Sequence, residues 1–128
     1  MRHDIVADLF SSLNNAEKVG KHLCTVPASK LVKNILQVMQ KKGYIGNFEF
    51  IDNGKSGFFK ISLIGRINYS KIIKPRFSVK KNEFEKWEMR YLPGKGFGIL
   101  ILSTPMGVMD QYEAQEKGLG GKLLGFVF

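Results

Sequence analysis

The chain has 128 residues, enough for one ordinary domain or for two very small ones that share an interface. Hydrophobic residues make up 44% of it, so the composition excludes a wholly disordered protein. Twenty Lys and Arg stand against eleven Asp and Glu, and the net charge of +9 at pH 7 favours a polyanionic partner, either nucleic acid or an anionic membrane surface.

The first half of the chain predicts the order helix, strand, helix, strand, strand. Apolar residues recur at helical spacing in both expected helices, and Pro27 ends the short strand between them. The last two strands flank the pair Asn53-Gly54, which is typical of a hairpin. The expected elements are helices over 4–19 and 28–42 and strands over 22–26, 44–51 and 58–64.

The second half begins with cations and no acids between residues 66 and 81. Residues 82–89 suit one helical turn or more. Residues 90–104 have the pattern of a hairpin, with a short strand, a Pro-Gly-Lys-Gly turn and a buried strand. The six cations of the basic run are Arg66, Lys71, Lys74, Arg76, Lys80 and Lys81.

The end of the chain predicts a short helix and a final strand. Asp110 and Glu113 have capping-box spacing for a helix that ends near Gly118, and residues 122–128 form the strand. The fold class is therefore α+β, with an N-terminal subdomain over 1–65 and a mainly antiparallel, β-rich subdomain over 66–128. We expect tight packing between the two, because each alone would be a marginal fold.

Cysteine usage and hydropathy indicate the compartment. A single cysteine, Cys24, cannot form an internal disulfide, so an oxidising environment is neither needed nor suggested. The first residues contain acids where a signal peptide needs an apolar core, and no apolar run approaches the ~20 residues of a membrane-spanning helix. We expect a soluble, cytoplasmic protein without a membrane partner.

No motif supports catalysis, a cofactor or a metal. His22 and Cys24 lie two residues apart, on one face of the expected strand, but no second pair completes four ligands. The glycines of 94–98 precede a strand, whereas the dinucleotide fingerprint follows one and opens a helix. The glycines of 118–121 lack the Ser or Thr of a P-loop.

The stretch “STPMG”, residues 103–107, offers chemistry for RNA recognition. Ser103 and Thr104 stand where a buried strand leaves the core, so we expect their hydroxyls to project from a rigid base toward a base edge, a 2′-OH or a phosphate. Glycines at 118, 120 and 121 would let a nucleic-acid backbone approach closely. The plainer alternatives are an ordinary turn, conformational glycines and a solvated basic strand pair.

Taken in order, the motifs resemble the universal small-subunit ribosomal protein family numbered eight (S-eight), in its archaeal or eukaryote-like form. The resemblance covers essentially the whole chain, and the combination is specific although no single piece is. The stretches that carry it are “DIVADLFSSLNNA”, “PASKLVKNILQVMQKKGYI”, “LIGRINYSKIIKPRFSVK”, “RYLPGKGFGILILST” and “GVMDQYEAQEKGLGGKLLGFVF”.

That resemblance implies a non-enzymatic protein that binds small-subunit rRNA at an irregular helix of the central domain and helps nucleate its assembly. It also implies neighbouring ribosomal proteins as partners, a monomer when free, and an mRNA that imitates the rRNA site as a further ligand. The tightest RNA contacts are implied for the C-terminal subdomain. The expected RNA-binding residues are Asp4, Lys30, Lys33, Lys55, Arg90, Ser103, Thr104, Pro105, Met106, Gly107, Gly120, Gly121 and Lys122.

Two positions depart from the bacterial pattern of the family. Pro105 stands where that pattern has Ser, and proline has neither a hydroxyl nor an N–H to donate. Lys122 stands where bacterial members commonly carry an acid, which favours another phosphate contact or a different surface partner. Two other function classes stay open: a small nucleic-acid-modifying enzyme that uses an exposed Ser or acid, and a basic adaptor with little RNA affinity.

Overall fold

A computed structural model describes residues 4–94 and 96–128, and it contains two compact units. The first unit ends at Ser70 and the second begins at Lys71, whereas the sequence placed the division after residue 65. Both units combine helices with antiparallel sheets, so the predicted α+β class is confirmed.

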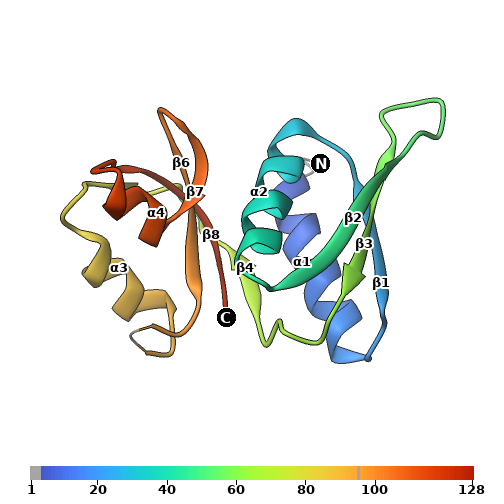
Figure 1. Ribbon diagram of the computed structural model, residues 1–128, viewed down its shortest axis with the longest axis horizontal. Coiled ribbons are helices and arrows are strands. Elements are labelled where there is room, and N and C mark those ends of the chain that lie inside the picture. Colours follow the sequence, from blue (N-terminus) through green and yellow to red (C-terminus); the bar gives the residue numbers. More distant parts are fainter. Residues whose placement is uncertain (1–3, 95) are drawn as a thin grey trace. The chain divides into compact units, whose positions relative to one another are not determined.

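The first unit has the predicted order of elements (Figure 1). Its three strands form an antiparallel sheet in the order β1-β3-β2, with the loop between β2 and β3 extending beyond the sheet. Its elements are α1 (Ile5–Lys18), β1 (Leu23–Pro27), α2 (Lys30–Lys41), β2 (Ile45–Ile51) and β3 (Phe58–Leu63).

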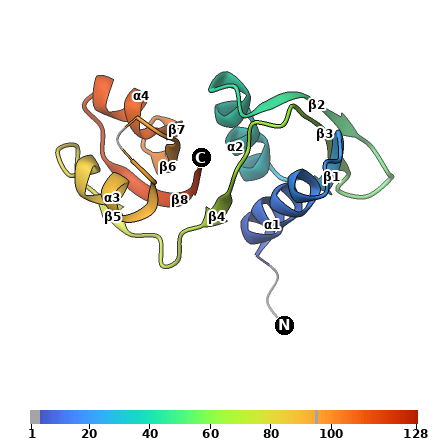
Figure 2. The same ribbon diagram turned by 90° about the horizontal axis from the view of Figure 1, so that it is seen from below.

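Both helices cover the same face of this sheet, and the core lies between the two layers (Figures 1 and 2). Burial alternates along β1 and β3, as expected of strands with one covered face. Leu9 of α1, Ile35 of α2 and Ile61 of β3 are completely buried. Burial of such side chains stabilises the unit by about 1.5 to 3 kcal/mol each.

The segment after β3 is attached to α1 through side chains of that helix. The Asn14 amide accepts hydrogen bonds from the Ser70 N–H (2.8 Å) and hydroxyl (2.9 Å), and it donates one to the Ser70 carbonyl. The Ile67 N–H donates to the Glu17 carboxylate at 2.9 Å. The polar groups of the buried Ser70 are thereby satisfied inside the unit.

The second unit contains a mainly antiparallel sheet with two short helices. The order is β4-β8-β6-β7, and β5 also pairs with β8. Its core joins both helices to the sheet through Trp87, Leu100, Ala114 and Leu123, among others. Its elements are β4 (Ser70–Ile72), whose first residue belongs to the first unit, β5 (Ser78–Val79), α3 (Phe84–Tyr91), β6 (Ile99–Thr104), β7 (Gly107–Asp110), α4 (Gln111–Glu116) and β8 (Gly121–Val127).

Three sequence-based details of this unit were wrong. The short strand expected near residue 90 is the end of α3, which continues to Tyr91 and stops before Pro93. The described part of the turn contains a Gly94–Phe97 bridge, and the buried strand of the expected hairpin is present as β6. Lys95 of the expected turn is outside the described residues. The strand β7 was not predicted. Asp110 does precede α4, but its side chain makes no capping hydrogen bond.

Candidate nucleic-acid interface

A tight, internally bonded turn joins β6 to β7. Thr104 pairs with Gly107, which leaves Pro105 and Met106 as the two residues of the turn. The Thr104 hydroxyl donates to the Gly107 carbonyl at 2.8 Å and accepts from the Met106 N–H at 3.2 Å. Gly107 has φ +118°, a conformation that L side chains rarely adopt. The turn is therefore fixed by Thr104 and Gly107.

The two neighbouring hydroxyls face opposite sides of the sheet, contrary to the expectation that both project. Ser103 is exposed, whereas only 8% of Thr104 is exposed and its hydroxyl is engaged within the turn. Successive residues of a strand point to opposite faces, so the two cannot project together. Ser103 presents a hydroxyl to solvent, and Thr104 holds the turn that carries it.

Ser103 belongs to a polar row that crosses three strands. Lys122 of β8 pairs with Ser103 of β6 on one side and with Ser78 of β5 on the other. Directly opposite residues have Cβ atoms about 4.5 to 5.5 Å apart and share a face. All three side chains are exposed. The sequence identified Ser103 and Lys122 but missed Ser78, because only the strand register brings it beside them.

The paired glycines let neighbouring strands approach, and they were expected to admit RNA. A Cβ on Gly121 would collide with the carbonyl oxygen of Ser103, and one on Gly120 would collide with that of Val79. The space beside both glycines is thus filled by the protein's own backbone. The two glycines shape the surface indirectly, because they allow the start of β8 to pack closely against β6 and β5.

The cations of the basic run are available to solvent, and one of them, Lys80, lies beside this surface. All six side chains between residues 66 and 81 are exposed. Lys80 follows β5 directly, and its Cα would lie 3.2 Å from a Cβ on Gly120. At the turn itself, Pro105 and Met106 are exposed, and 68% of Met106 is accessible. A cationic, partly apolar surface is suited to phosphates and to base faces.

Arg90 is not part of this turn. It lies in the last turn of α3, and its guanidinium carbon is 5.2 Å from the ring centroid of Phe77 and 5.5 Å from those of Trp87 and Tyr91. This arrangement is a cation–π contact with stacked aromatic rings. Arg90 remains exposed, so its outward N–H groups can still meet a phosphate.

The four expected residues of the first unit stand at helix starts and in a loop. Asp4 caps α1, since its carboxylate accepts from Val6 N–H at 3.0 Å and Ala7 N–H at 3.3 Å. Lys30 and Lys33 are exposed in the first turn of α2. Lys55 is exposed in the β2–β3 loop, where its N–H donates to the Asn53 side chain at 3.0 Å. Figure 1 shows α1 and α2 starting at the same end of the unit.

The remaining candidate chemistry gives no second site. His22 lies outside β1 and is exposed while Cys24 is buried, so the pair does not share a strand face as expected. Burial raises the pKa of the Cys24 thiol, and the nearby charge of Lys21 opposes this effect. Within residues 4–94 and 96–128, no group of three or more His, Cys, Asp or Glu could hold a metal ion, and no helix is long and apolar enough to cross a membrane.

Comparison with known proteins covers nearly the whole chain. The family model of ribosomal protein S8 matches residues 4–128. The small ribosomal subunit protein uS8 of Methanococcoides burtonii is 56% identical over 126 residues, which span 98% of this chain and 97% of that protein. The residues that the family model matches span both units.

Proposed function

Because this chain belongs to the ribosomal protein S8 family, we propose that it binds small-subunit rRNA directly, at an irregular helix of the central domain. Its role as a structural constituent of the small ribosomal subunit, in the cytoplasm, follows from family membership. Direct binding at that helix would let it nucleate assembly of the domain, beside neighbouring ribosomal proteins. A free monomer would suffice for this step.

The polar row on the second unit is the observation that carries the proposal. Ser103 and Ser78 flank Lys122 on one exposed face, and the turn held by Thr104 fixes the position of Ser103. A lysine supplies a phosphate contact, whereas a hydroxyl can both donate to and accept from a base edge or a 2′-OH. A fixed hydroxyl beside a cation is therefore suited to a specific RNA contact.

The geometry of RNA explains why the helix should be irregular. The major groove of A-form RNA is too deep and narrow for side chains, so sequence is read mainly from unstacked bases and from the shallow groove. The exposed Met106 and Pro105 at the tip offer apolar surface to a splayed base. A regular duplex would meet only the cations and the hydroxyls that touch its backbone.

The first unit would add contacts that position the RNA without reading it. Lys30 and Lys33 lie at the start of α2, where the helix dipole also favours an anion. Lys55 would contact phosphate from its loop, and Asp4 would act by fixing the start of α1. An mRNA segment that imitates the rRNA helix would meet the same surface, which is the basis for proposing autoregulation.

The test is competition between two RNAs for the purified full chain. A stem with the irregular central-domain helix should bind at least about tenfold more tightly than a regular duplex of equal length, since the fixed hydroxyl and the tip find partners only there. Ser103→Ala should remove most of this preference. Ser11→Ala, an exposed serine of α1, is the matched control and should leave it intact.

Equal affinity for the two RNAs would overturn specific recognition and leave only charge-driven binding. Little affinity for either RNA would favour the basic adaptor. A hydrolytic or transferase activity on the stem that Ser103→Ala abolishes would favour a nucleic-acid-modifying enzyme.

A further inference from the structure

Charges on α3 are sorted to different faces. Lys86 and Arg90 lie over aromatic rings, with the Lys86 ammonium 5.3 Å from the Trp87 ring centroid. Glu85, Glu88 and Met89 follow helical spacing on another face and line a pocket. A helix that was merely solvated would gain from mixing the two signs along one face. In this strongly basic protein, one face of α3 is therefore acidic.

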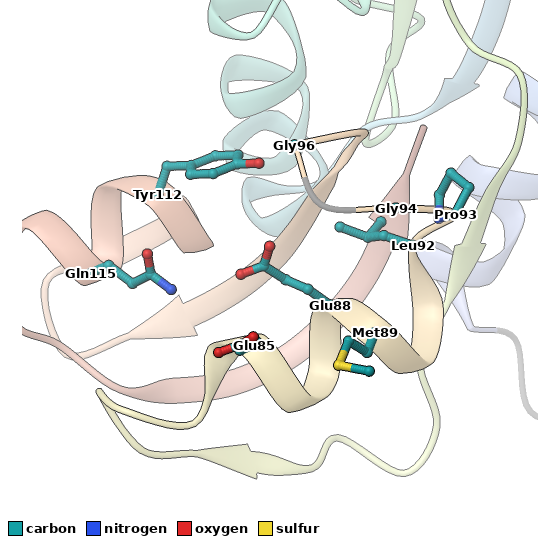
Figure 3. Close-up of a pocket in the computed structure, with 9 residues that line it drawn as sticks. All are labelled: Glu85, Glu88, Met89, Leu92, Pro93, Gly94, Gly96, Tyr112 and Gln115. Carbon is teal, nitrogen blue, oxygen red and sulfur yellow. The ribbon is translucent and has the colours of Figure 1, made fainter.

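This acidic face forms one wall of a pocket of about 730 Å³ (Figure 3). The opposite wall is Tyr112 and Gln115 of α4, and Leu92, Pro93, Gly94 and Gly96 lie at one end. The Glu88 side chain points into the space between the walls. Burial raises the pKa of the Tyr112 hydroxyl, with further contributions from the carboxylates of Glu88 and Asp110, as expected when Tyr112 and Glu88 face each other.

The pocket also exposes apolar surface at its rim. Met89 is 78% exposed and Phe97 is 68% exposed, and a Cβ on the lining Gly94 would lie 3.2 Å from the Phe97 ring. Large apolar side chains that are exposed at the border of a pocket are typical of an interaction surface. Pro93 and the ring of Tyr112 continue the apolar surface into the pocket.

We propose that this pocket docks a short basic segment of another protein, in which Lys or Arg alternates with apolar residues. None of the nine described residues that line it is a Lys, Arg or His, while Glu85 and Glu88 supply negative charge. The aliphatic stem of a Lys or Arg would lie along Met89 and Tyr112, with its charged head at the carboxylates. Apolar neighbours in the segment would cover Met89 and Phe97.

Charge complementarity selects this occupant over the alternatives. RNA is disfavoured because its phosphates would meet the carboxylates of Glu85 and Glu88. A second copy of this chain is disfavoured by repulsion between two molecules of charge +9. A basic segment of a different protein is attracted by the pocket and can still keep its other cations on surrounding RNA. The protein would then bind RNA with one surface and a cationic protein segment with another.

The experiment is an NMR titration of the isotope-labelled full chain with an amidated hexapeptide of alternating arginine and leucine. Chemical-shift changes should concentrate on amides of residues 84–94 and 111–116. Glu85→Gln/Glu88→Gln should weaken binding about fivefold to tenfold, as expected for two partly exposed ion pairs. Met89→Gln, which keeps both carboxylates, should weaken it as well. The same hexapeptide with glutamate in place of arginine should not bind.

The matched control is Glu49→Gln/Glu116→Gln, which changes the net charge equally at two exposed positions outside the pocket. Equal weakening by this control, or shifts spread over the whole surface, would overturn the proposal. The proposal would also be overturned if the rRNA stem alone shifted the same amides. It would be overturned, too, if those amides shifted because the chain associates with itself at higher concentration. Ser103→Ala should leave peptide binding unchanged. Glu85→Gln/Glu88→Gln should keep the preference for the irregular rRNA stem. The two variants therefore distinguish failure of peptide docking from failure of RNA recognition.

Discussion

Two neighbouring hydroxyls at the end of β6 have different structural tasks. Ser103 faces solvent, while the hydroxyl of Thr104 donates to Gly107 and accepts from Met106 within the turn. Thr104→Val keeps the shape and removes both hydrogen bonds, so it should lower the free energy of unfolding by about 1 to 2 kcal/mol. Urea denaturation measures this. Thr25→Val, at an exposed position of β1, should change stability little, and an equal loss there would contradict the role of Thr104.

A second residue-scale prediction concerns the close approach at Gly121. A methyl group there would overlap the carbonyl oxygen of Ser103 and lie 3.1 Å from the Thr104 side chain, so backbone must move. Gly121→Ala should lower the free energy of unfolding by about 2 kcal/mol or more and weaken binding to the irregular stem. In Gly43→Ala the added methyl meets open space, and only the strain at φ +81° remains, about 1 kcal/mol. Equal losses in the two variants would show that packing at Gly121 is unimportant.

At the scale of elements, one side chain of α1 secures the first residue of β4. Asn14→Ala removes the amide that pairs with the backbone and hydroxyl of the buried Ser70. Those groups then lose their partners, so the free energy of unfolding should fall by about 2 to 3 kcal/mol. Asn15→Ala, at the exposed neighbouring position, should cost less than about 0.5 kcal/mol. A small effect of Asn14→Ala in chemical denaturation would contradict this attachment.

The buried thiol of β1 gives a prediction about pH. Burial raises the pKa of Cys24 in the folded state, so between the unfolded and folded pKa values the native state binds more protons than the unfolded state. Stability from this group is complete below the unfolded pKa of about 8.5 and declines as pH rises above it. The difference in unfolding free energy between the natural chain and Cys24→Ala should therefore shrink from pH 7.5 to pH 10. A constant difference would contradict the raised pKa.

The helices and strands differ in how well the sequence predicts them. Strong periodicity and clear ends specified α1, α2 and the β2–β3 pair, because apolar stripes and hairpin residues are local signals. The strand before Pro93 was wrong because Arg90 and Tyr91 continue α3, where they contact the aromatic rings of the second unit. The strand β7 was missed because four residues give too short a pattern. Tertiary contacts decided the first case, and pairing with β6 forms the strand in the second.

For the whole molecule, the sequence suggested residues of the candidate site but not their arrangement. Ser103 and Lys122 were chosen separately, and only strand register shows that they are neighbours and that Ser78 joins them. The expected openings at Gly120 and Gly121 are filled by backbone. The acidic pocket was not predicted, since its carboxylates and its tyrosine come from different helices.

We propose that the cations contact phosphate and that the Ser103 hydroxyl provides specific recognition. The most direct measurement is the salt dependence of binding to the irregular stem and to a regular duplex. Lys122→Gln should weaken binding to both RNAs. It should also reduce the magnitude of the slope of log K against log salt concentration by about one. Ser103→Ala should weaken binding to the irregular stem by about tenfold, leave binding to the duplex unchanged, and leave the salt slope unchanged. If Ser103→Ala affects both RNAs equally or not at all, charge alone holds the RNA and the claim for the turn is wrong.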